Sequence, residues 1–150
     1  MKQKYEELQK KYNFPRYEEM VSDFDIDSIG KEDNIIRETL KKMFDKIDFY
    51  SRTMESLVQP DSTYGTMKEA SSLSVTEQAM VRKLYVELMY LTRQFTLHGL
   101  EYKEEESAKF INQIYKQWKS LKPELKLILQ KIMEAWKKQH ETQHDKGYFG

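Results

Sequence analysis

Five residues near the end of the chain have the types and the spacing that could hold a metal ion. The segment His140-Glu141-Thr142-Gln143-His144 places two histidines four positions apart. On a helix, residues at this spacing share one face, so both imidazoles could ligate the same zinc ion. The intervening Glu141 could then take a proton from a zinc-bound water. The pattern makes a zinc-dependent hydrolase one alternative for this protein.

The surrounding segment resembles the zinc motifs of two enzyme families. Residues 139–147, QHETQHDKG, are similar to the last motif of peptide deformylases and to the opening of the metzincin zinc motif. The resemblance implies a third ligand, which is a cysteine in the deformylases and falls at position 150 in the metzincins. This chain has no cysteine, and Gly150 stands at that position. We therefore assign no catalytic residue, cofactor or metal ligand, and we interpret His140 as part of a helix end.

Basic residues are concentrated in the last third of the chain. Residues 109–150 carry nine basic and four acidic side chains, a net charge of +5, whereas the whole chain is neutral. A basic surface attracts polyanions, so nucleic-acid binding is a further alternative. No arginine lies beyond Arg93, although arginine is favoured for bidentate contacts to phosphates and bases. We interpret the following lysines as a solvated helix face: Lys109, Lys116, Lys119, Lys122, Lys126, Lys131, Lys137 and Lys138.

A third pattern has the alternating aspartates that open a calcium loop. It is Asp23-Phe24-Asp25-Ile26-Asp27. Ser28 replaces the glycine of such a loop, and Asn34 stands where a bidentate glutamate belongs. We interpret this segment as a solvated acidic turn.

Composition favours long helices over a turn-rich β fold. The chain has 150 residues, of which 39% are hydrophobic and 33% charged, with only five glycines and three prolines. Lack of cysteine excludes disulfides and thiol nucleophiles. The chain has no apolar run long enough to span a membrane, and its start is too polar for a signal peptide. We therefore expect a single-domain cytoplasmic protein that does not enter the membrane.

Apolar spacing predicts four long helices, at about 33–58, 74–98, 102–121 and 123–144. Asp33 is expected to cap the first helix. For the second, Ser74 and Glu77 have the spacing of a capping box, and Gly99 is expected to end it in a left-handed conformation. Pro123 can open the last helix, which we expect to fold back on the third. The predicted fold is an all-α antiparallel four-helix bundle over residues 31–150.

Two further segments complete the predicted domain. Residues 1–30 are expected to form a helical arm packed on the bundle, because they carry many large apolar side chains and a break at Pro15. The polar stretch 59–73 is expected to be a mobile loop.

The helix predicted at 74–98 is apolar on two faces. One face carries Leu84, Leu88 and Leu91 and suits a bundle core, whereas Val86 and Leu97 point largely the other way. Both faces need cover, from the rest of the chain or from a partner. We expect the arm at 1–30 to cover the second face.

The surplus of apolar surface supports a protein that acts by association rather than by catalysis. We predict protein–protein interaction, with a second copy or with another protein, through Val86, Tyr90, Leu97 and Phe49. The zinc-hydrolase and polyanion interpretations remain alternatives, and we do not expect nucleic acid to be the partner.

Overall fold

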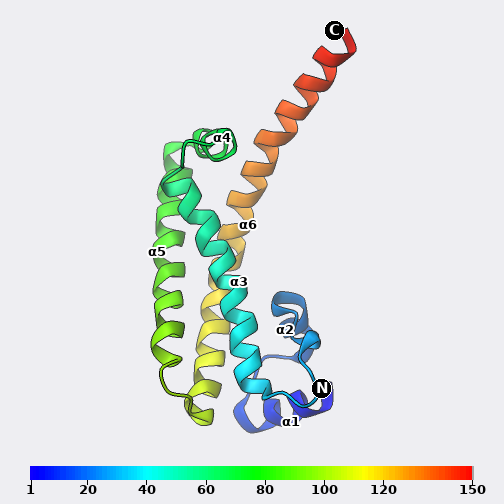
Figure 1. Ribbon diagram of the computed structural model, residues 1–150, viewed down its shortest axis with the longest axis vertical. Coiled ribbons are helices and arrows are strands. Elements are labelled where there is room, and N and C mark those ends of the chain that lie inside the picture. The colour runs from blue at the N-terminus through cyan, green and yellow to red at the C-terminus, as the bar shows by residue number, and fades with distance from the viewer. Residues whose placement is uncertain (150) are drawn as a thin grey trace. The chain divides into compact units, whose positions relative to one another are not determined.

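The computed structural model describes the backbone of residues 1–149 and the side chains of residues 1–143. Every regular element in that part of the chain is helical, which confirms the all-α prediction. In chain order the elements are α1 (Lys2–Tyr12), α2 (Tyr17–Phe24), the 3-10 helix η1 (Ile26–Ser28), α3 (Ile35–Val58), α4 (Tyr64–Ser71), α5 (Val75–His98) and α6 (Glu104–Phe149) (Figure 1).

Polar residues at the helix ends explain where several helices begin and end. The backbone becomes left-handed at Asn13 after α1 and at Asp25 after α2, with φ of 58° and 55°. Asparagine and aspartate tolerate this conformation better than other residues with a side chain. The predicted capping box of α5 is confirmed, because the Ser74 N–H donates to Glu77 Oε1 at 2.8 Å and the Glu77 N–H donates to Ser74 Oγ at 3.1 Å.

The cap of α3 lies one residue later than predicted. The Arg37 N–H donates to Asn34 Oδ1 at 3.1 Å, so Asn34 is the N-cap. The carboxylate of Asp33 instead accepts a hydrogen bond of 3.1 Å from the Gly30 N–H. Both residues are good caps by type, and only the backbone path decides which of them faces the helix end.

The expected left-handed glycine after α5 is not found. No glycine in the described part of the chain has a positive φ. The Gly99 N–H donates to the Phe95 carbonyl at 2.9 Å, which continues the helical hydrogen-bond pattern by one residue. The prediction for Gly99 was therefore wrong, although the end of the helix was placed correctly.

The connector predicted as a mobile loop at 59–73 contains the helix α4. Asp61 organises the turn before it, because its Oδ1 accepts hydrogen bonds of 2.5 Å from the hydroxyls of both Thr63 and Thr66. These hydrogen bonds lower the pKa of Asp61. Short polar side chains that bond to nearby backbone and hydroxyl groups are typical of helix starts.

The predicted hairpin at Pro123 is wrong, because α6 is one uninterrupted helix with Pro123 in its interior (Figure 1). A proline inside a helix costs about 3 kcal/mol. Against this, each large aliphatic side chain that α6 buries contributes about 1.5–3 kcal/mol. The buried side chains continue across the proline at alternating spacings of three and four residues: Ile111, Ile114, Trp118, Leu121, Leu125, Ile128 and Ile132.

The chain divides into two compact units, and each contains segments of α3, α5 and α6. Unit 1 comprises Met1–Tyr50 and Leu88–Lys119, and unit 2 comprises Ser51–Glu87 and Ser120–Gly150. Within residues 1–149 the long helices are α3, α5 and α6, three instead of the four that the apolar spacing predicts.

In unit 1, α5 and α6 form an antiparallel pair. His98 Nε2 and Ser107 Oγ are 2.8 Å apart, and the rings of Phe95 and Phe110 are 5.1 Å apart. The second contact lies farther than the first from the turn that joins the two helices, on both α5 and α6. The two helices therefore run in opposite directions. Phe44 of α3 joins the same cluster, with its ring 5.5 Å from that of Phe95.

The first thirty residues contact α6 within unit 1. The Tyr12 hydroxyl donates to Glu104 Oε2 at 2.8 Å, and Asn112 Nδ2 donates to the Tyr12 carbonyl at 2.9 Å. Further along α6, the rings of Phe24 and Trp118 lie 5.5 Å apart. These contacts attach α1 and α2 to one side of α6.

Two buried tyrosines strengthen the same part of unit 1. Tyr5 is fully buried, and its hydroxyl donates to the Pro15 carbonyl at 2.6 Å. The Tyr115 hydroxyl donates to Glu19 Oε2 at 2.9 Å. Burial raises the pKa of both hydroxyls, and for Tyr115 the nearby Glu19 carboxylate raises it further.

In unit 2, charged pairs connect α5 with α6 in the same antiparallel sense. Lys83 Nζ lies 3.6 Å from Glu124 Oε1, and Lys131 Nζ lies 3.7 Å from Glu77 Oε2. The apolar core between them is built from residues of all three long helices and of the turn before α5: Met54, Leu57, Leu73, Val81, Leu84, Leu121, Leu125, Ile128 and Ile132.

The short helix α4 packs on α6 within unit 2. Trp136 Nε1 donates to Glu69 Oε2 at 2.9 Å, and Gln139 Nε2 donates to the Tyr64 hydroxyl at 2.7 Å. The side of α6 that faces α4 therefore carries Trp136 and Gln139.

Candidate functional site

Helix α5 buries one side and exposes large apolar residues on the other, as the sequence predicts. Val86 is 66% exposed, Tyr90 64% and Leu97 71%. All three lie on one continuous helix, so helix geometry alone sets their relative positions. The opposite side supplies core residues that are at most 1% exposed: Val81, Leu84, Leu88 and Leu91.

The arm does not cover this face, contrary to our expectation. Tyr90 and Leu97 stay exposed although the arm belongs to the same unit. The arm buries its own apolar side chains elsewhere, and its ring contact through Phe24 is with α6. The surplus of apolar residues in the first thirty positions shows that they pack, but it does not show on which helix.

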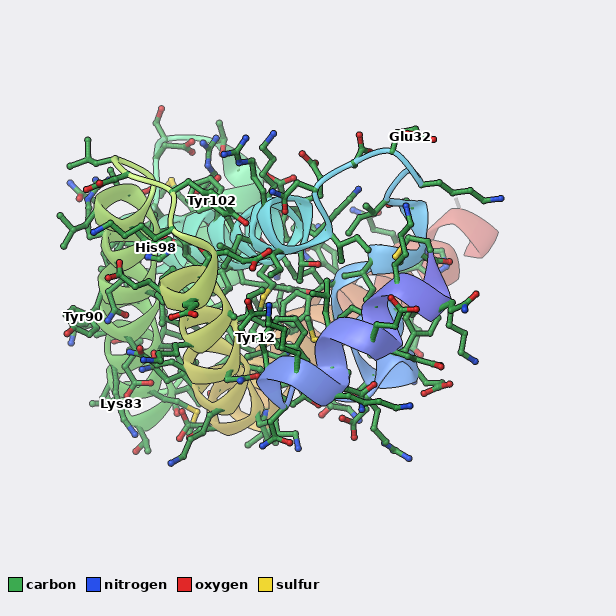
Figure 2. All side chains as sticks on the ribbon, turned by 90° about the horizontal axis from the view of Figure 1, so that it is seen from below. Tyr12, Glu32, Lys83, Tyr90, His98 and Tyr102 are labelled. Carbon is green, nitrogen blue, oxygen red and sulfur yellow. The ribbon has the colours of Figure 1, made fainter. Side chains whose placement is uncertain are left out.

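The exposed side of α5 has a regular spacing that the sequence analysis did not use. Its residues follow one another at alternating intervals of four and three, the repeat of a coiled-coil seam. Figure 2 shows Tyr90 at the outer edge of α5, pointing away from the helix. We call these exposed residues the α5 seam: Ala79, Lys83, Val86, Tyr90, Arg93 and Leu97.

Charged side chains lie near both ends of the α5 seam. Near the start of α5, Lys83 Nζ lies 4.0 Å from Glu87 Oε1 and 3.6 Å from Glu124 Oε1. At the other end, in unit 1, a hollow of about 460 Å³ lies beside Leu97 and is lined by the acidic residues Glu101 and Glu106. Glu101 Oε1 lies 3.9 Å from Lys103 Nζ, so Glu101, like Lys83, already has a partner of opposite charge within the chain.

Phe49 and Leu127 are two further large apolar residues that are exposed, and both lie on other helices. Phe49 of α3 is 63% exposed, with its ring edge-on to Tyr50 at 5.2 Å. Leu127 of α6 is 58% exposed. Neither residue belongs to the α5 seam, so neither extends it.

A second hollow, of about 430 Å³, lies in unit 1 between α3 and the end of α5. Two cations on its rim already have partners. The Arg37 guanidinium lies 4.4 Å from the centroid of the Tyr102 ring, and Lys41 Nζ lies 3.2 Å from Glu38 Oε1. Its floor is apolar: Leu40, Phe44 and Phe95. Figure 2 labels His98 and Tyr102, which also line this hollow.

The zinc motif lies on α6, and the described part of it faces solvent. The side chains of His140 and Glu141 are exposed, while the side chain of His144 lies outside the described residues. Among the side chains that the structure describes, no three His, Cys, Asp or Glu residues are grouped so that they could hold a metal ion. Within the described residues, His140 is therefore not part of a group of three residues that could bind a metal ion.

The lysines predicted to form a solvated face are all exposed on α6. Several of them contact groups of their own chain. Lys119 Nζ lies 4.9 Å from the centroid of the Tyr115 ring, and Lys131 is paired with Glu77. These contacts are internal to the chain and need no polyanion to explain them.

Comparison with protein-family models, curated proteins and solved structures finds no match to the chain. In the part of the chain that the structure describes, no helix combines the length and the apolar character needed to cross a membrane.

Proposed function

We propose that this protein acts by non-enzymatic association, in which a second copy of the chain binds at the α5 seam. The observation that carries the proposal is the exposure of Val86, Tyr90 and Leu97, each by more than 60%, on one face of a continuous helix. Burying exposed apolar surface is the main favourable contribution to association between proteins.

The size of the seam limits a dimer that uses this surface alone to a weak and reversible one. From Ala79 to Leu97 the seam extends over about 27 Å of a helix that is about 10 Å wide, which gives a footprint of roughly 270 Å². Stable interfaces bury about 800 Å² on each partner. We therefore expect a dissociation constant in the micromolar range or above, with monomer and dimer in exchange.

The direct test is the mass of the protein in solution as a function of concentration. Light scattering and sedimentation from about 10 µM to 1 mM cover the range expected for such a footprint. The weight-average mass should rise from 18.1 kDa toward twice that value. A mass of 18.1 kDa at every concentration would refute the proposal.

A pair of matched variants locates the interface. Val86→Glu places a charge on the α5 seam, and Leu127→Glu places the same charge on α6 at a residue of similar exposure. Only Val86→Glu should keep the protein monomeric, because only there would a carboxylate be buried on association. Equal behaviour of the two variants would show that dimerisation does not use the seam. Circular dichroism confirms that both variants remain helical.

A further inference from the structure

We infer that unit 1 binds a small apolar monocarboxylate in the hollow of about 430 Å³ between α3 and the end of α5. All the residues that line this hollow belong to unit 1, and none of them belongs to the α5 seam. The inference is therefore independent of the proposed self-association. It rests on the apolar floor of the hollow and on one cation at its rim.

The floor of the hollow offers a surface of aromatic rings to the apolar body of a ligand. The rings of Phe44 and Phe95 meet edge-on with their centroids 5.5 Å apart, and Leu40 precedes Phe44 by one turn of α3. Thr96 and Gly99 also line the hollow, and their small size leaves the floor uncovered. Hollows of about 300–1,000 Å³ with an apolar lining and a few polar groups are typical of small-molecule sites.

Arg37 supplies the positive charge for a carboxylate. Its guanidinium lies 4.4 Å from the centroid of the Tyr102 ring. A contact with an aromatic ring uses the charge of a guanidinium but does not pair its N–H groups with oxygen. Among the described side chains, no carboxylate forms an ion pair with Arg37. Its N–H groups can therefore donate to both oxygens of a ligand carboxylate.

The position of Arg37 is set by Asn34, the N-cap of α3. Asn34 Oδ1 accepts a hydrogen bond of 3.1 Å from the Arg37 backbone N–H and one of 3.3 Å from the Tyr102 hydroxyl. One side chain thus connects the backbone of Arg37 with the ring that its guanidinium contacts. Groups that are held in place before a ligand arrives lose less conformational freedom on binding, which favours affinity.

The other charged groups at the rim narrow the class of ligand. Lys41 Nζ is paired with Glu38 Oε1 at 3.2 Å, which leaves Arg37 as the cation for the ligand. Asp45 follows Arg37 by eight residues, about 12 Å further along α3. Its carboxylate repels a second carboxylate at that end of the ligand. The hollow therefore favours a monocarboxylate over a dicarboxylate of the same length.

Titration of the isotope-labelled protein with sodium octanoate, followed by the amide chemical shifts in NMR spectra, tests the inference. For a ligand of this size we expect a dissociation constant on the order of 1 mM. The amide signals that move should include those of Leu40, Phe95 and Gly99, which line the hollow. Shifts that leave out the residues of the hollow would overturn the inference.

Two related probes test the class of ligand. Octanol has the same carbon chain without the charge, and suberate has the same number of carbons with a carboxylate at both ends. Each should bind about fivefold more weakly than octanoate. Octanol that binds as tightly as octanoate would overturn the role of Arg37, and suberate that binds as tightly would overturn the preference for a monocarboxylate.

Two variants with matched controls locate the site. Arg37→Gln should weaken octanoate binding by about fivefold and leave octanol binding unchanged. Arg82→Gln removes the same charge from an exposed residue outside the hollow and should have no effect. Thr96→Trp places a large ring at an exposed position of the lining and should abolish the octanoate shifts. Thr76→Trp makes the same change on α5 outside the hollow and should not.

The NMR spectrum of each variant without ligand shows whether it is folded. Unchanged octanoate binding by folded Arg37→Gln or folded Thr96→Trp would overturn the inference. An equal loss of affinity in Arg82→Gln and Arg37→Gln would show that octanoate responds only to net charge, which would overturn it as well.

Discussion

Replacement of Pro123 by alanine tests the most consequential feature of the fold, the continuity of α6. Pro123 is exposed and lies in the interior of the helix Glu104–Phe149. A proline there lacks the N–H that would bond the Lys119 carbonyl, and its ring crowds that same carbonyl. Because the proline side chain is not part of the core, its replacement should change the helix and little else.

The expected effect is a gain in stability. Alanine restores the hydrogen bond and removes the clash, which together are worth about 3 kcal/mol in a helix interior. The free energy of unfolding should rise by about 2–3 kcal/mol, and the melting temperature by about 5–10 °C for a chain of this size. If two helices met in a hairpin at this point, proline would instead be a favourable first residue, and alanine would destabilise the protein.

Urea unfolding followed by far-UV circular dichroism measures the change. Lys126→Ala is the matched control, because Lys126 is exposed on the same helix and its replacement should stay within about 0.5 kcal/mol of the natural protein. A loss of stability for Pro123→Ala, or no difference from the control, would refute the reasoning for a continuous α6.

Four further predictions concern hydrogen bonds, pH and metal. Tyr5→Phe removes the hydroxyl that donates to the part-buried Pro15 carbonyl and should cost about 0.5–1.5 kcal/mol in urea unfolding. Burial raises the pKa of the Tyr5 hydroxyl, so as pH rises the hydroxyl loses its proton in the unfolded chain before it does so in the folded protein. Above about pH 10, the free energy of unfolding should therefore fall by about 1.4 kcal/mol per pH unit because of this group. Tyr5→Phe should remove this part of the pH dependence. The hydrogen bond from the Ser74 backbone N–H lowers the pKa of the Glu77 carboxyl, so the ionised carboxylate stabilises the folded protein above the ordinary glutamate pKa. This stabilisation is lost as pH falls below that value. Glu77→Gln should therefore lose less stability in acid than the natural protein. EDTA should leave the melting temperature unchanged, because the described residues supply His140 with no set of metal ligands.

The helix boundaries show how far local rules reach in this chain. Ser74 and Glu77 form the predicted capping box because both partners lie within one turn, where few backbone paths compete. Asn34 replaces Asp33 as the cap of α3 because two adjacent residues of equal suitability can be separated only by the path of the chain before the helix. The helix α4 was missed because local rules do not reach the residues that hold it in place. Its start depends on the hydrogen bonds of Asp61, and it packs against Trp136 and Gln139 of α6.

The candidate site was visible in part from the sequence. The exposure of Val86, Tyr90 and Leu97 follows from their angular position on a helix whose opposite side is a core stripe. That Lys83 and Arg93 lie on the same line of α5 could also have been found from the sequence, because residues three and four positions apart share one side of a helix. The acidic hollow beside Leu97 could not have been found from the sequence, because it combines side chains from α5, the following turn and α6.

Local periodicity by itself determined that this protein is helical, that α3 and α5 are long, and that α5 is apolar on two faces. These properties depend on residues three and four positions apart, whose interactions are the same in any fold. The tertiary structure decided that Pro123 lies inside one helix, because burial of an apolar stripe outweighs the local cost of a proline. It also decided that the arm packs on α6 and leaves the α5 seam in solvent, because the choice between two apolar faces depends on which of them fits the shape of the arm.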